Sequence, residues 1–133
     1  MRHSSPAIDV VVGIVEALNR GDVDGMLARM HPEFEWRPLE SSPASGVARG
    51  HEGVRRYVED WLGTFEDIRL GLTNPAEIGD RVVVDVRAAG RGRGSGLQLD
   101  STFCQLWTIR DEKAFAMEEH PTRDDALTAL RAP

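Results

Sequence analysis

This chain of 133 residues has little cysteine, no long apolar run and no pair of histidines at a spacing typical of metal ligands. Cys104 is its one cysteine, so a disulfide within the chain is excluded and a cysteine-based zinc site is not expected. The histidines do not follow a spacing such as His-x-x-x-His, and we expect neither a metal nor a cofactor. No apolar run approaches the length of a membrane span, and residues 10–15 do not follow the pattern of a signal peptide. We therefore expect a cytoplasmic protein.

An excess of positive charge is also missing. The formal net charge is −6, so the surface as a whole attracts neither nucleic acid nor an anionic membrane. Hydrophobic residues make up 41% of the chain and charged residues 29%, which is typical of a soluble globular domain. The length suits one domain with a sizeable core and is too short for two.

Apolar residues at helical spacing predict three helices in the first half of the chain. The first begins after Ser5, whose hydroxyl can cap it, and Gly21 ends it. Asp22 caps a second helix that runs to Met30 and ends before Pro32. The third helix is the clearest, because its apolar positions follow the i, i+3, i+4 pattern without interruption: Val54, Tyr57, Val58, Trp61, Leu62 and Phe65.

Alternation of apolar and polar residues predicts the strands. Short strands are expected over residues 33–37 and 68–72, and a meander of three strands over residues 81–120. The serine-, proline- and glycine-rich stretch 38–50 suits either a loop over the mouth of a pocket or a plain connection. A short helix over residues 122–130 closes the chain. Helices first and a meander last indicate an α+β fold with the helices on one face of a curved sheet.

Three segments carry a family resemblance. Residues 14–37 (IVEALNRGDVDGMLARMHPEFEWR) resemble the opening of the nuclear-transport-factor-2-like superfamily, and residues 50–54 (GHEGV) resemble the start of its third helix. Residues 107–113 (WTIRDEK) resemble the sheet of its SnoaL-like branch. The resemblance implies one SnoaL-like domain over residues 1–133, with a cone-shaped, cystatin-like α+β barrel. Its curved antiparallel or mixed sheet would wrap the N-terminal helices around an internal cavity.

The resemblance also implies where catalytic groups would lie. SnoaL-like cyclases carry an acid/base carboxylate on the last strand, and that position matches Glu119, although the histidine that they use on the adjacent strand has no counterpart here. Three positions used by similar ketosteroid isomerases fall on Ile14, near Trp36 and near Gln105, so that proton shuttle is lost. Gln105 can still donate a hydrogen bond to a substrate oxygen. We predict Glu119 and Gln105 as catalytic residues.

Aromatic and apolar side chains supply the predicted ligand contacts. Alternation along the last strand puts Phe115 and Met117 on one face with Glu119, and we expect this face to look into the cavity. A carboxylate in such surroundings is desolvated, which raises its pKa and suits proton transfer near neutral pH. The full set of predicted ligand-binding residues is Trp36, Tyr57, Trp61, Phe103, Trp107, Phe115 and Met117. The same apolar periodicity is also typical of plain core packing.

Two functions follow from this pattern, because a fold of this kind does not determine activity. The first is an isomerase, cyclase or hydratase that acts on a small apolar carbonyl or hydroxyl compound by acid/base catalysis. The alternative is a non-catalytic ligand-binding or dimeric accessory protein with the same fold. Asp85 and Arg87 alternate with valines and are predicted on the outer face of the sheet. The resemblance implies a homodimer interface on this face, and the same pattern also suits a face exposed to solvent.

Overall fold

The computed structural model describes residues 5–39 and 46–132. Within these residues, helices and strands follow one another in the order α-α-β-β-α-β-β-β-β-α. In chain order the elements are α1 (Pro6–Asn19), α2 (Val23–Ala28), β1 (Met30–Arg37), β2 (Ala48–Arg49), α3 (Gly50–Thr64), β3 (Phe65–Ile78), β4 (Arg81–Gly92), β5 (Gln98–Arg110), β6 (Lys113–His120) and α4 (Arg123–Arg131).

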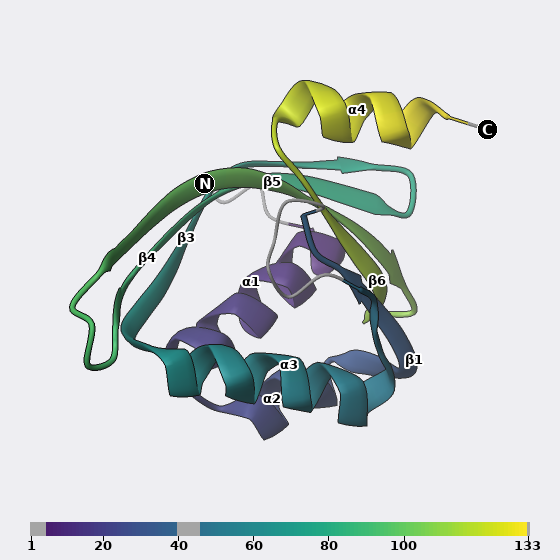
Figure 1. Cartoon of the computed structure of the whole chain (residues 1–133). Coiled ribbons are helices and arrows are strands. Elements are labelled where there is room, and N and C mark those ends of the chain that lie inside the picture. The colour runs from purple at the N-terminus through teal and green to yellow at the C-terminus, as the bar shows by residue number, and fades with distance from the viewer. Residues whose placement is uncertain (1–4, 40–45, 133) are drawn as a thin grey trace.

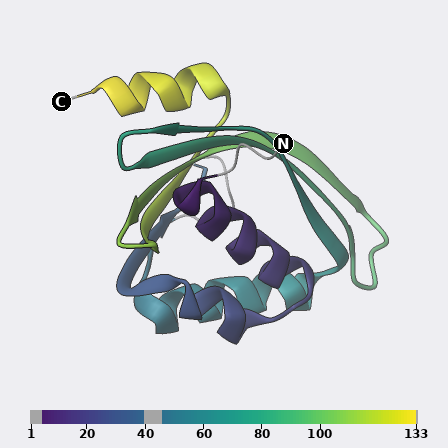
Figure 2. The same ribbon diagram turned by 180° about the vertical axis from the view of Figure 1, so that it is seen from behind.

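The strands of the described residues form one six-stranded sheet in the order β2-β1-β6-β5-β4-β3. β1 and β6 run parallel, whereas every other neighbouring pair is antiparallel. The sheet is strongly curved and does not close on itself (Figures 1 and 2). Helix α1 lies in its concave side, α2 and α3 cover the opening, and α4 lies on the convex side. The predicted α+β fold with a mixed, curved sheet is confirmed.

Local hydrogen bonds fix the beginnings of the first two helices. The Ser5 hydroxyl accepts a hydrogen bond from the Ile8 amide at 3.1 Å, and the Asp22 carboxylate accepts one from the Gly25 amide at 2.9 Å. Between these helices Gly21 has a φ of 72°, a left-handed conformation that glycine adopts without steric cost. The predicted starts of both helices are therefore correct.

Strand pairing changes two of the predicted boundaries. The second helix ends at Ala28 and not at Met30, because Met30 already pairs with Ala114 of β6 and is buried. The strand expected over residues 68–72 is the middle of β3, which continues past Asn74-Pro75. The register of β3 against β4 shifts at this point, so proline is accommodated in a bulge of an edge strand.

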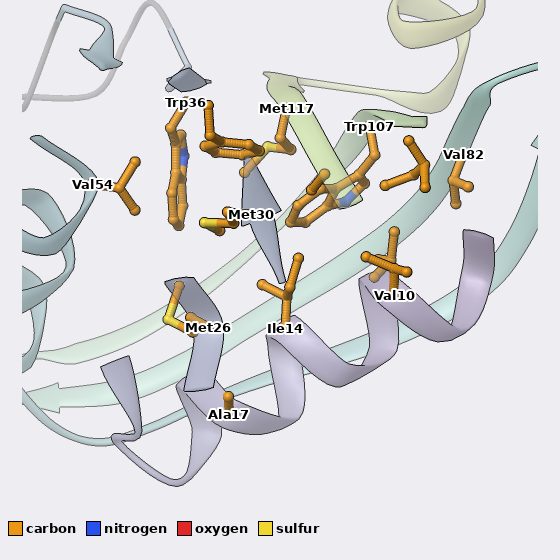
Figure 3. Packing of buried hydrophobic residues seen from close by; sticks show 14 of the residues in the cluster. Val10, Ile14, Ala17, Met26, Met30, Trp36, Val54, Val82, Trp107 and Met117 are labelled. Carbon is orange, nitrogen blue, oxygen red and sulfur yellow. The ribbon is translucent and has the colours of Figure 1, made fainter. Parts of the chain in front are cut away.

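The core lies between α1 and the concave face of the sheet. Val10 and Ile14 of α1 are buried in one cluster with Val82 of β4 and Trp107 of β5 (Figure 3). On the convex face, Ala126 of α4 packs with a second cluster of buried side chains that consists of Val83, Cys104 and Leu106. Where these two clusters lie, both faces of β4 and β5 are covered. This explains why valines follow one another without interruption at the start of β4.

The outer-face residues named in the dimer prediction are engaged within the chain. The Asp85 carboxylate accepts hydrogen bonds from Arg123 of α4 at 3.2 Å and from Asn74 at 3.1 Å. Arg87 donates two hydrogen bonds of 3.0 Å to Asp100. Because α4 covers part of this face, a homodimer would use the part that α4 leaves open, and the dimer stays a prediction. No helix in the described residues is both long and apolar enough to cross a bilayer.

One side chain ties the end of α1 to the edge strand. Asn19 donates to the Leu70 carbonyl at 3.1 Å and accepts from the Leu70 amide at 2.9 Å, so it satisfies both backbone groups of one β3 residue. Helix α1 is thereby held at a fixed distance from β3, on the side of the sheet away from β6.

We expect Asn19→Ala to lower the free energy of unfolding by about 1–3 kcal/mol, because two partly buried backbone groups lose their partners. The neighbouring control Arg20→Ala removes an exposed side chain and should change it by less than about 0.5 kcal/mol. Urea denaturation of both variants measures the difference. Equal losses would show that the contact between Asn19 and Leu70 contributes nothing specific.

Candidate functional site

The half of the concave face that α1 leaves uncovered forms a cavity of about 200 Å³. Leu18 at the end of α1 lines it, as do side chains from α3, β1, β3, β4, β5 and β6. Four aromatic residues predicted as ligand contacts are part of this lining: Trp36, Tyr57, Trp61 and Phe103. Their ligand-binding role stays a prediction. At about 200 Å³ the cavity is smaller than the roughly 300–1,000 Å³ that is usual for ligand pockets, so it suits a compact molecule.

Four side chains of the lining carry a carboxylate, amide or hydroxyl group. Glu119 is on β6, whereas Ser101 and Gln105 are on β5, and the Tyr57 hydroxyl belongs to α3. Trp36 and Tyr57 pack against each other with ring centroids 5.0 Å apart. A mostly apolar wall with a few polar groups gathered on one side is the usual make-up of a small-molecule site.

Glu119 is held by two hydrogen bonds from residues that also line the cavity. Its Oε2 accepts from the indole Nε1 of Trp36 at 3.1 Å, and its Oε1 accepts from the backbone amide of Leu39 at 3.1 Å. Burial among apolar side chains raises the pKa of Glu119 above its ordinary value of 4.5, although the bonds from Leu39 and Trp36 act in the opposite direction. The carboxylate is therefore fixed in position and more basic than one in water.

Gln105 lies directly opposite Glu119 in the antiparallel pair of β5 and β6. It is the buried polar residue of the described core, with 1% of its surface exposed. Its Oε1 accepts a hydrogen bond from the indole Nε1 of Trp107 at 2.9 Å. Residues opposite one another on one face have Cβ atoms about 4.5–5.5 Å apart, so one small ligand can reach both polar groups.

Ser101 is a cavity residue that the sequence reasoning missed. Leu99, Ser101, Phe103 and Gln105 alternate along β5, and all four line the cavity. Because successive side chains of a strand point to opposite faces, every second residue before Gln105 lies on the same face as Gln105. This alternation was the signal that could have identified Ser101. Leu39 was also missed, because its contribution is a backbone amide that no side-chain pattern reveals. Residues 40–45 of the predicted loop lie outside the described residues.

Three predicted ligand contacts do not line the cavity, and Phe115 is a clear correction. The register between β5 and β6 slips between Thr108 and Ile109, so Phe115 is the extra residue of a bulge. Its ring stacks on His31 with centroids 4.2 Å apart, away from the cavity. Alternation counted straight through the bulge therefore placed this side chain on the wrong face.

Met117 and Trp107 are on the concave face but belong to the packed core. They are directly opposite each other in the pair of β5 and β6, two residues along each strand from Gln105 and Glu119. Figure 3 shows both side chains among the core residues above α1. Trp107 therefore contacts Gln105 from the core side and does not reach the cavity, which corrects its predicted role as a ligand contact.

Histidines of the described residues take no part in the cavity lining. His51 is hydrogen-bonded to the Met30 carbonyl at 2.9 Å, and His120 to Glu118 at 2.8 Å. No group of three or more His, Cys, Asp or Glu side chains in the described residues could hold a metal ion. The chemistry that this cavity offers comes from a carboxylate, an amide and hydroxyls.

A curved mixed sheet around helices, with an apolar cavity lined by side chains of both, places this chain in the class of cone-shaped α+β proteins (Figure 1). The chain belongs to the family of SnoaL-like domains, whose model matches residues 11–117. It is a SnoaL-like protein with a cavity of a size that suits a small molecule. Among curated proteins, no relative of this chain is found.

Solved structures share this fold over nearly the whole chain. TerC, co-crystallised with polyporic acid, is 29% identical, with a TM-score of 0.78 over 95% of this chain and 98% of TerC. An NTF2-like protein of unknown function from Burkholderia pseudomallei is 22% identical, with a TM-score of 0.78 over 97% of this chain and 100% of its own. A putative SnoaL-like polyketide cyclase from Jannaschia sp. CCS1 is 20% identical, with a TM-score of 0.76 over 100% and 99%.

We expect Trp36→Phe to raise the pKa of Glu119 further, because the variant removes a hydrogen bond that stabilises the ionised form. Trp61→Phe is the matched control, since Trp61 lines the same cavity and its indole makes no hydrogen bond to Glu119 among the described residues. Titration of the ¹³C-labelled side-chain carboxyl by NMR measures both variants. An unchanged or lower pKa in Trp36→Phe would contradict the assignment.

The raised pKa of Glu119 also predicts how stability depends on pH. The folded state binds this proton more tightly than the unfolded chain, whose glutamate has an ordinary pKa of 4.5. The contribution of Glu119 to the free energy of unfolding is therefore greatest below pH 4.5 and falls as pH rises through the folded pKa. The variant Glu119→Gln lacks this decline. The free energy of unfolding of the variant minus that of the wild type should therefore increase as pH rises from 4.5 through the folded pKa. Denaturation at several pH values measures this difference. A flat difference would contradict the prediction.

Proposed function

We propose that this protein binds a compact, mostly apolar carbonyl or hydroxyl compound in the cavity and uses Glu119 to move a proton on it. The reaction class is isomerisation, cyclisation or hydration by acid/base catalysis. The observation that carries the proposal is the position of Glu119: a carboxylate with a raised pKa, in an apolar cavity, directly opposite the buried amide of Gln105. Groups with perturbed pKa values in clefts are typical of active sites.

The proton transfer can be written with these residues alone. The ionised Glu119 removes a proton from a carbon next to the ligand carbonyl, and the electron pair of the broken C–H bond moves onto the carbonyl oxygen. The amide N–H of Gln105 donates a hydrogen bond to that oxygen and stabilises its negative charge. In a β,γ-unsaturated ketone, protonated Glu119 then returns the proton to the γ-carbon of the conjugated enolate. The carbonyl re-forms and the double bond moves into conjugation with it, which isomerises the ligand. In a cyclisation the enolate carbon attacks a second carbonyl, and the proton goes to the new alkoxide.

The hydrogen bonds around Glu119 support this role. Trp36 and Leu39 hold the two oxygens in one orientation, and each carboxylate oxygen has a further lone pair that can face the cavity. Proton transfer needs a base held within hydrogen-bond reach of the reacting atom, so a fixed carboxylate is favourable. The similar structure of TerC was co-crystallised with polyporic acid, which supports a small organic molecule as the ligand class.

A second candidate is ligand binding without turnover. It is favoured by two observations: the oxygens of Glu119 already accept hydrogen bonds from the protein, and no histidine of the described residues lines the cavity to share the proton. In this case Glu119 would only orient the ligand.

We expect the wild-type protein to catalyse deuterium exchange at the carbon next to the carbonyl of 2-tetralone in D₂O, followed by proton NMR. Glu119→Gln should reduce the exchange rate by about 10²- to 10⁴-fold, the usual contribution of a positioned general base. Glu118→Gln is the matched control, because Glu118 is the preceding residue, pairs with His120 and does not line the cavity. Exchange that is equally fast in Glu119→Gln would exclude the catalytic role and, if 2-tetralone still binds, would favour the second candidate.

A further inference from the structure

The cavity lies over the part of the sheet where the side chains of β4 become small. Along the concave face of this strand, every second residue gives the series Val84, Val86, Ala88 and Gly90. Val84 and Val86 belong to the packed core, whereas Ala88 lines the cavity. The decrease in side-chain volume towards Gly90 therefore helps to leave the space that a ligand can occupy.

Ser101 lies over this part of the sheet, at some distance from the predicted catalytic pair. It is directly opposite Ala88, which is itself opposite Leu70 of β3, and all three residues line the cavity. Gln105 follows four residues later on the same face of β5, so the Cα atoms of Ser101 and Gln105 are up to about 13 Å apart at the usual rise of about 3.3 Å per residue. Phe103 lies between them on this face. The sheet side of the cavity thus has hydrogen-bonding groups at two separate places.

The hydroxyl of Ser101 has no hydrogen-bond partner among the described residues, and it can be reached from the cavity. Every buried side-chain nitrogen or oxygen of the described residues has a partner, so an oxygen without one is accessible. A hydroxyl both donates and accepts hydrogen bonds, whereas the adjacent side chains Ala88, Leu99 and Phe103 can do neither. On this wall Ser101 is therefore the partner that a polar group of a ligand meets.

We propose that Ser101 is a specificity-determining residue, and that the cavity takes a carbonyl compound with a hydroxyl group at the end remote from the carbonyl. The carbonyl lies beside Gln105 and Glu119, and the remote hydroxyl pairs with Ser101. Two hydrogen bonds of about 2.9 Å, subtracted from a separation of about 13 Å, leave roughly 7 Å between the two ligand oxygens. Two fused six-membered rings with oxygens at opposite ends match this span. The inference rests on the proposed function for the placement of the carbonyl, and it does not require proton transfer.

Three compounds with the same carbon skeleton test this selection by calorimetric titration: 2-tetralone, 6-hydroxy-2-tetralone and 8-hydroxy-2-tetralone. The two hydroxytetralones are isomers, and only the 6-hydroxy compound carries its hydroxyl at the end opposite the carbonyl. We expect the wild-type protein to bind the 6-hydroxy isomer about three- to tenfold more tightly than the 8-hydroxy isomer, the usual effect of one hydrogen bond. Equal affinities for the two isomers, or no binding of any of the three compounds, would overturn the inference.

The variant Ser101→Ala removes the hydroxyl and keeps a small side chain in the wall. We expect its preference for the 6-hydroxy isomer to fall below about twofold. It should bind 2-tetralone at least as tightly as the wild type does, because this ligand offers the Ser101 hydroxyl no partner. An unchanged preference between the isomers would overturn the role of Ser101, and so would an equal loss of affinity for all three compounds, which indicates a structural effect.

Thr102→Val is the matched control, because it removes the next hydroxyl along β5. Thr102 is exposed on the convex face, where it borders a groove with Asp85 and Arg123, and it does not line the cavity. This variant should keep the wild-type preference for the 6-hydroxy isomer. Equal losses of preference in Ser101→Ala and Thr102→Val would show that the effect comes from β5 as a whole and would overturn the inference.

The two proposals fail separately. If the wild type shows no preference between the isomers while deuterium exchange of 2-tetralone still depends on Glu119, only the role of Ser101 is overturned. If Ser101→Ala abolishes a clear preference while exchange is equally fast in Glu119→Gln, only the catalytic role of Glu119 is overturned.

Discussion

The packing of α1 against the concave face of the sheet is the contact on which the rest of this structure depends. Its apolar residues fill one half of the concave face, together with Trp107 and Met117 from the two central strands. At its C-terminal end the helix is fixed to the edge strand through Asn19, and only Leu18 reaches into the space beyond. On the other half of the curved sheet, side chains of α3 line the space without filling it, so a cavity remains there.

Gln105 and Glu119 lie at the boundary between the packed half and the open half. The donor-only indole of Trp107 satisfies the oxygen of Gln105 from the core, whereas Trp36 and Leu39, which line the cavity, donate to the oxygens of Glu119. These hydrogen bonds offset part of the burial cost of each polar group, and each group keeps further hydrogen-bonding capacity. The arrangement combines a stable core with polar groups in the cavity wall because the same side chains serve both.

Sequence reasoning identified most of this arrangement where the signal was local. Helix caps at Ser5 and Asp22, the apolar stripe of α3 and the resemblance at residues 107–113 were enough to predict the curved sheet and the position of Glu119. It was wrong about Phe115, because alternation with period two holds only within an uninterrupted ladder and the bulge in β6 reverses it. It also missed Ser101 and the amide of Leu39 as neighbours of the site.

The chain by itself determined the α+β class, the strand that carries the acidic residue and the order of elements except for the two-residue strand β2, which lies in the stretch predicted as a loop. These properties depend on spacing along the backbone. Only the tertiary structure decided which tryptophan serves which polar group. Trp36 is 83 residues away from Glu119 in sequence and yet donates to it, whereas Trp107, expected to contact a ligand, lies behind Gln105 in the core. Such assignments depend on the pairing of β1, β5 and β6 and on how far α1 fills the concave face, and both are set by contacts between segments distant in sequence.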